Sequence, residues 1–223
     1  MSKAWQKFIK NSSNSGLANM QDKSPAKITR LAEAGYFLRI ILLVLQNKSD
    51  RARGFYLPNS SVLRSFYAFI WCLPAQLFMW SLLWSKLSNQ SDSKIIDKTA
   101  FLFQVATFDI LGWIMSACAI FIILSAVNLK KAIVPLIIAS NWFSLLAVYV
   151  FFIPDTLSYF LPALSDFIDV IDFIVYFTVV GLYFRLVKHV LGGQKMMAFA
   201  ITLASVVMGL FLSSMVFQSV IQT

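Results

Sequence analysis

The stretch that decides the fold runs from residue 102 to residue 153: LFQVATFDILGWIMSACAIFIILSAV (102–127), the basic turn NLKK (128–131), and AIVPLIIASNWFSLLAVYVFFI (132–153). Each apolar run has at least the ~20 residues that a helix needs to cross a bilayer. Because the turn between them is so short, we expect two antiparallel, neighbouring transmembrane helices.

Three further segments have the same character, at residues 65–84, 167–187 and 196–221. The whole chain is 59% hydrophobic and only 13% charged, whereas soluble domains carry ~25% charged residues. Such a chain cannot cover its apolar residues with a polar shell. We therefore predict an all-α membrane protein in which residues 65–223 form a bundle of about five transmembrane helices. The third helix should end near residue 153, and the partly apolar stretch that follows Pro154 should lie at headgroup level.

The first 64 residues differ from the rest in composition. Residues 1–27 are rich in Ser, Asn, Gln and Lys and predict a mobile, basic cytoplasmic tail. Residues 28–46 look helical, but their uninterrupted apolar run, 40–45, is far too short to cross a bilayer. We expect an amphipathic helix lying in the membrane interface, joined by a polar linker that completes the segment 28–64.

Basic residues are distributed unevenly along the chain, and this predicts its orientation. With the N-terminus inside, the inner regions hold 16 Lys and Arg residues and the outer regions hold 3. The sequence therefore predicts a cytoplasmic N-terminus and a non-cytoplasmic C-terminus, in a bacterial plasma (inner) membrane. The net charge of +9 raises nucleic acid as a partner, but its concentration before the first span favours an anionic cytoplasmic leaflet. The arginines expected to contact lipid headgroups are Arg30, Arg39, Arg51, Arg53 and Arg64.

Carboxylates inside apolar segments are the strongest candidates for a functional site. Asp166, Asp169 and Asp172 recur every three residues and form one stripe, and Asp172 and Asp109 lie at matching depths of about 8 to 11 Å from the outer boundary. One hypothesis is an outward-facing cation or proton site made by Asp109, Asp169 and Asp172, with Asn141 and Ser144 as neutral donors or acceptors. The alternative is that Asp166 and Asp169 are interfacial, while Asp109 and Asp172 are protonated or hydrogen-bonded core groups.

Residues that carry catalytic chemistry are scarce. His189 is the only histidine, and Walker-type glycine loops, HExxH and CxxC are missing. We therefore expect a protein that is not an enzyme and that binds neither a metal nor another cofactor. Small residues recur every four positions at Ser205, Gly209 and Ser213, and again at Gly112 and Ser116, a spacing that favours close helix packing.

The segment LRSF (63–66) running into WCLP (71–74) resembles the start of the first helix in bacterial relatives of the Yip1-type membrane proteins. Five helices and a basic cytoplasmic head are similar to that family's architecture. The resemblance implies a non-enzymatic, multi-pass protein that acts through contacts with lipids, with other membrane proteins or with itself, and it transfers no active-site residue. The alternative function is a cation- or proton-coupled transporter or channel component that uses the carboxylates.

Overall fold

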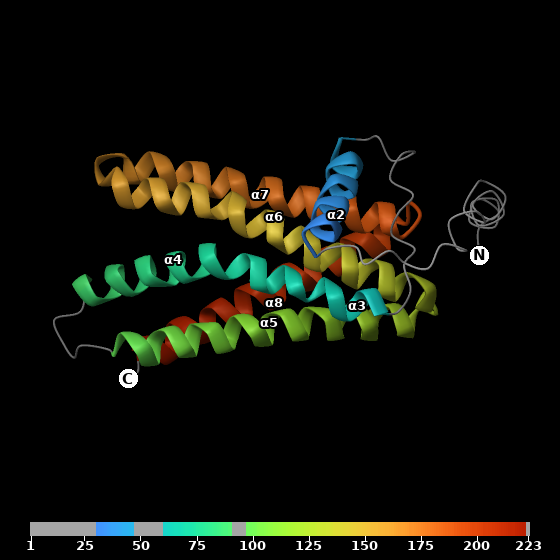
Figure 1. Cartoon of the computed structure of the whole chain (residues 1–223), viewed down its shortest axis with the longest axis horizontal. Helices are drawn as coiled ribbons and strands as arrows, with labels where there is room; N and C mark the ends of the chain where they lie inside the picture. Colours follow the sequence, from blue (N-terminus) through green and yellow to red (C-terminus); the bar gives the residue numbers. More distant parts are fainter. Residues whose placement is uncertain (1–29, 47–59, 91–96, 222–223) are drawn as a thin grey trace. The chain divides into compact units, whose positions relative to one another are not determined.

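A computed structural model describes residues 30–46, 60–90 and 97–221 (Figure 1). The predicted tail at 1–27, most of the predicted linker, and Arg51 and Arg53 lie outside the described residues. The chain divides into two units between Phe37 and Leu38, a boundary that falls inside the helix Arg30–Leu45, and the helices from Ser60 onward belong to the second unit.

Within the described ranges the chain is helical, without strands. The helices are α2 (Arg30–Leu45), α3 (Ser60–Ser65), α4 (Tyr67–Gln90), α5 (Lys98–Ala126), α6 (Ile133–Phe160), α7 (Ser165–Val190) and α8 (Lys195–Ile221). Short 3₁₀ turns precede α6 and α7, at Lys130–Ala132 and Pro162–Leu164.

Five helical segments are long and apolar enough to cross a membrane, as the sequence predicts. They are Val62–Ser88, Lys98–Ala126, Lys130–Phe160, Pro162–Val190 and Lys195–Met215. The described part of the chain therefore has the helix count expected of a multi-pass membrane protein.

The expected end of the third helix near residue 153 is wrong. Helix α6 continues through Pro154, which is buried, to Phe160. Within a packed apolar bundle a proline is tolerated because neighbouring groups satisfy the backbone that it disturbs. Most of the stretch that follows residue 153 is consequently helical, and a short turn at Pro162–Leu164 joins α6 to α7.

Helix α6 is the centre of the bundle. Half of its most apolar window is buried, compared with 11% for α5 and for α7. It packs mainly against α4 and α7, while α8 packs against α5 and α7 (Figure 1). The outer helices therefore leave much of their apolar surface uncovered.

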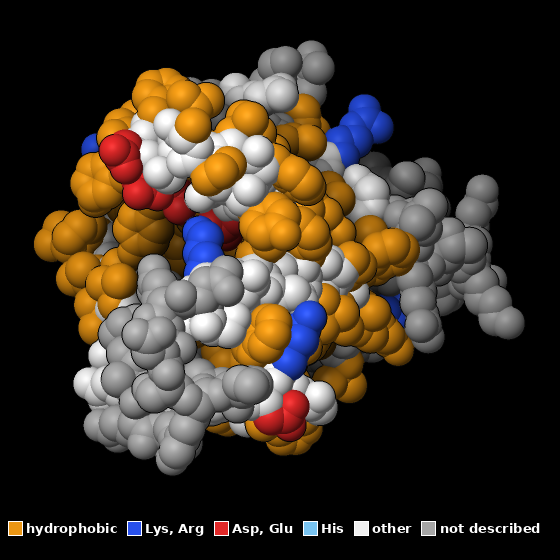
Figure 2. All heavy atoms as spheres, turned by 90° about the vertical axis from the view of Figure 1, so that its left-hand side faces the viewer, with side chains coloured by type: hydrophobic (Ala, Val, Ile, Leu, Met, Phe, Trp, Pro, Cys, Tyr) orange, Lys and Arg blue, Asp and Glu red, His pale blue; other side chains and the backbone are white. Residues whose placement is uncertain are grey.

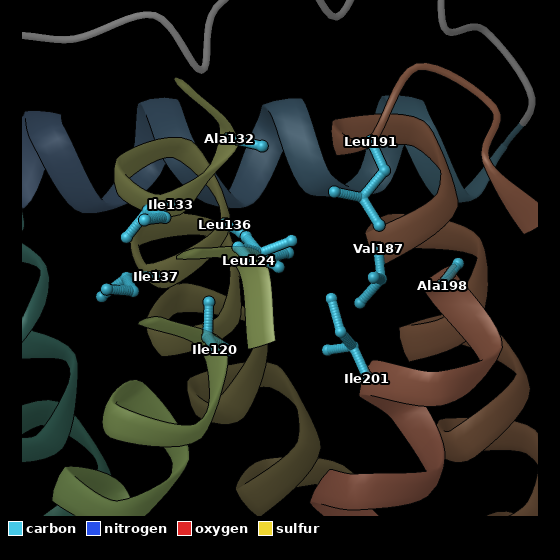
Figure 3. Packing of buried hydrophobic residues seen from close by; sticks show 10 residues of the cluster. All are labelled: Ile120, Leu124, Ala132, Ile133, Leu136, Ile137, Val187, Leu191, Ala198 and Ile201. Atoms are coloured by element: carbon cyan, nitrogen blue, oxygen red, sulfur yellow. The ribbon is translucent and has the colours of Figure 1, made fainter. Parts of the chain in front are cut away.

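The best-packed part of the core lies at one end of the bundle, beside the basic turns (Figure 3). Leu124 of α5, Leu136 of α6, Val187 of α7 and Ile201 of α8 meet there, and each is at most 1% exposed. The turn from α7 to α8 needs glycine at two positions, because Gly192 and Gly193 have φ values of 64° and 91°. This end holds the last turns of α5 and α7 and the first turns of α6 and α8.

Candidate functional site

Asp109 is held between two helices. Its Oδ2 accepts a hydrogen bond from Nε1 of Trp80 at 3.0 Å and a longer one from Nε2 of Gln76 at 3.4 Å. Both donors lie on α4, and Asp109 lies on α5. Because Gln76 and Trp80 are four residues apart, they share one face of α4, and that face meets α5.

The surroundings of Asp109 are apolar. Trp80 packs with Phe101 and Val105 of α5 in a small buried cluster. Gln76 is 6% exposed, and its Oε1 has no hydrogen-bond partner among the described residues. The carboxylate therefore lies next to a buried acceptor oxygen as well as two donors. Sequence reasoning missed both partners, although their spacing of four within a span was a usable signal.

Asn141 belongs to a different place in the bundle. It is buried in α6, and its Nδ2 donates to Oγ of Ser65 at 2.8 Å. Ser65 in turn donates to the carbonyl oxygen of Val62 at 2.7 Å. This relay ties α6 to α3 at the start of the first span, and it does not involve Asp109.

Asp169 and Asp172 lie near the start of α7. Asp169 is exposed and Asp172 is half-buried. The charge of Asp172 interacts with those of Asp169 and Lys86, and Asp155 of α6 interacts with Asp172 and Lys86. In Figure 2, which views this end of the bundle, acidic side chains gather beside a basic one. Lys86 and Asp155 are members of this group that the sequence did not single out.

The carboxylates and the amide of the predicted site are therefore split over three environments. Among the residues that the structure describes, no hydrogen bond joins Asp109 to Asn141, Asp169 or Asp172. The same residues contain no group of three or more His, Cys, Asp and Glu side chains placed to hold a metal ion. Asp109 is instead a hydrogen-bonded group between α4 and α5, as the alternative interpretation describes it, and Asn141 connects α6 to α3.

A cavity of about 410 Å³ lies between α5, α6, α7 and α8. It is lined by apolar side chains together with hydroxyl groups, among them Ser140 of α6 and Tyr183 of α7, whose oxygens are 3.0 Å apart and share a hydrogen bond. Ser205 and Gly209 of α8 also line it.

The sequence favoured close packing for these small residues. The structure confirms a close approach only at Gly112, where a Cβ would lie 3.1 Å from Leu212 Cδ1, while a Cβ on Gly209 would meet nothing within 4 Å.

No family model, curated protein or solved structure matches the chain. The class is consequently defined by the fold itself: the described part of the chain is all-helical and contains five helices of membrane-spanning length and composition.

Proposed function

We propose that this protein is a non-enzymatic, multi-pass membrane protein that acts through contacts with lipids and with other membrane proteins. The observation that carries the proposal is the apolar surface left uncovered by the outer helices. On α7, for example, Phe173 and Phe177 are 64% and 56% exposed. A continuous apolar surface of this kind needs lipid or a partner helix.

The polar groups inside the spans support a binding protein more than a catalyst. The Trp80 bond to Asp109 joins α4 to α5, and the Asn141 bond to Ser65 joins α6 to α3. Intramembrane hydrogen bonds of this type hold helices in register. Joining the helices of the bundle is therefore a sufficient role for these polar groups.

Charge supports a cytoplasmic N-terminus and a non-cytoplasmic C-terminus in a bacterial plasma membrane. Lys130 and Lys131, in the turn before α6, belong to the predicted inner set, and so does Lys195 at the start of α8. Arg64 and Arg39 are exposed and are proposed to contact anionic headgroups together with Arg30, Arg51 and Arg53.

Helix α2 is proposed to lie in the interface. Its 16 residues extend about 24 Å at 1.5 Å per residue, which is less than the ~30 Å of hydrocarbon in a typical bilayer. Five spans with a basic cytoplasmic head would also suit a relative of the Yip1-type proteins.

Gentle purification from native membranes tests this function. We expect membrane lipids or another membrane protein to stay bound in a mild detergent, as detected by native mass spectrometry. A Phe177→Arg variant should lose bound material, because it places a charge on the lipid-facing surface. Recovery of the wild type as a bare chain, without lipid or partner, would contradict the proposal.

A cation- or proton-coupled transporter component is the second candidate, and one observation favours it. The Asp109 carboxylate lies beside the buried, unpartnered Oε1 of Gln76, and ionisable groups within a span often mark ion pathways. A small cleft of about 190 Å³, lined in part by Lys86, Asp155 and Trp80, approaches the same indole. Asp109→Asn in liposomes should abolish ion or proton flux in this case, with Asp166→Asn as the control.

A further inference from the structure

The cavity between α5, α6, α7 and α8 lies at the middle of the spans. Ser140 is seven residues from the start of α6, and Tyr183 is seven residues from the end of α7, so each is about 10 Å from the basic end of the bundle at 1.5 Å per residue. Phe151, toward the other end of the cavity, is nine residues from the end of α6, or about 14 Å. In a hydrocarbon layer of ~30 Å, the part of the cavity lined by Ser140 and Tyr183 lies inside the layer, while Ser213, two residues from the end of the span Lys195–Met215, extends the lining toward the opposite boundary.

The lining of the cavity is uncharged. Its fifteen described residues include seven with hydroxyl groups, the others being apolar, and none is Asp, Glu, Lys, Arg or His. A charged or zwitterionic headgroup at this depth would have no charged partner and would be costly to desolvate. The lining therefore selects an uncharged ligand.

The hydroxyl groups also indicate how a ligand would be held. Ser144 donates its proton to the carbonyl oxygen of Ser140, and Ser205 donates to that of Ile201, both at 3.0 Å. Each serine oxygen keeps lone pairs that can accept a bond from a ligand hydroxyl. Tyr183 interacts with the hydroxyl groups of both Ser140 and Ser205, so the three hydroxyl groups form one cluster that offers acceptor lone pairs to a ligand hydroxyl.

We propose that this cavity binds a neutral, single-chain lipid whose head carries hydroxyl groups, a proposal that rests on the lipid-contact function above. A volume of about 410 Å³ falls within the range of small-molecule sites, which are mostly apolar with a few placed polar groups. The chain lies along the apolar lining, and the head meets Ser140, Tyr183 and Ser205.

Gly209 allows the cavity to be filled with little disturbance to the fold. A Cβ at this position would meet nothing within 4 Å, and the residue lies in the cavity lining on α8. Replacing glycine inside a helix also favours the helical state. Gly181 on α7 is a matched control, because its Cβ would likewise meet nothing within 4 Å and it is exposed outside this cavity.

The test is photolabelling of the full chain in phosphatidylcholine liposomes. Two probes with the same photoreactive chain are compared, a monoacylglycerol and a lysophosphatidylcholine. We expect the monoacylglycerol to label peptides of α6, α7 and α8 around the cavity and the lysolipid to leave them unlabelled. Gly209→Leu should reduce that labelling by about tenfold or more, because the new side chain takes the ligand's volume. Gly181→Leu should leave it unchanged.

Tyr183→Phe and Ser205→Ala give a second measurement that does not depend on filling the cavity. Each removes one hydroxyl and should weaken monoacylglycerol labelling by about fivefold, the value of one net hydrogen bond. Labelling that is equal for both probes and insensitive to Gly209→Leu would overturn the cavity site, while the general lipid contacts would stand. Absence of labelling by either probe anywhere on the chain would contradict both proposals.

Discussion

The indole Nε1 of Trp80 lies 3.0 Å from Oδ2 of Asp109 and donates a hydrogen bond across the contact between α4 and α5. Trp80 is 6% exposed, so this bond forms within an apolar cluster. A hydrogen bond in low dielectric is stronger than one in water, and losing one partner leaves the other buried and unpaired. The bond is therefore expected to set the register of α4 on α5.

Trp80→Phe is predicted to destabilise the bundle. It removes the indole donor and keeps most of the apolar volume, so the cost should be about 1.5–3 kcal/mol, within the usual penalty for leaving a buried partner unpaired. For a chain of this size that is a fall of roughly 3 to 12 °C in the melting temperature. Thermal unfolding in detergent measures it.

Trp71→Phe is the control for that variant. Trp71 is on the same helix and is 40% exposed, so its replacement should leave the melting temperature almost unchanged. Equal melting temperatures for Trp80→Phe and the wild type would mean that the bond to Asp109 contributes nothing to assembly.

The Asn141 relay is predicted to be cooperative. Asn141→Ala and Ser65→Ala each remove one side of the 2.8 Å bond between α6 and α3. Each should cost about 1–3 kcal/mol, because the remaining buried partner is left without its bond. In the double variant we expect a coupling free energy of about 0.5–3 kcal/mol. The second substitution should therefore lower the stability of the single variant by less than it lowers the stability of the wild type. Strict additivity in a double-mutant cycle would show that the two side chains do not act together.

The number of helices was predictable from the sequence, whereas the partners of the polar residues were not. Hydropathy and length are local signals, and they identified the five apolar segments. Gln76 and Trp80 donate to Asp109 because of the way α4 and α5 are rotated and shifted relative to each other. A single sequence does not specify that rotation and shift. The carboxylates of α7 looked equivalent to Asp109 in depth, but depth along a helix does not decide which neighbour a side chain faces.

Pro154 and Gly209 also show that a local sequence pattern does not determine how helices pack. A proline is a reliable helix breaker in water, yet in α6 it is buried and the helix continues to Phe160. The spacing of Ser205, Gly209 and Ser213 is typical of close helix contact, and the structure instead places these residues along a cavity. In both cases packing between helices decides the outcome over the local pattern.

Cysteine accessibility is predicted to report the orientation. In a chain lacking Cys72 and Cys118, a cysteine at Leu164, in the turn between α6 and α7, should react with a membrane-impermeant maleimide added to intact cells. A cysteine at Lys131, in the turn between α5 and α6, should react only after permeabilisation. Both wild-type positions are exposed, so burial would not explain a difference. The reverse pattern would contradict the charge-based orientation.

Gly112 is predicted to tolerate a small side chain and not a branched one. A Cβ there would lie 3.1 Å from Cδ1 of Leu212, the flexible end of a side chain on α8. Gly112→Ala should therefore change stability little, because Leu212 can shift and alanine favours the helix. Gly112→Val adds two methyl groups at the same point and should cost about 1–3 kcal/mol by overpacking the contact between α5 and α8.

Gly181→Val, where a Cβ would meet nothing within 4 Å, is the control for the effect of a branched residue in a helix. Melting temperatures that fall equally for the two valine variants would locate the cost in the helix itself and not in the contact with Leu212.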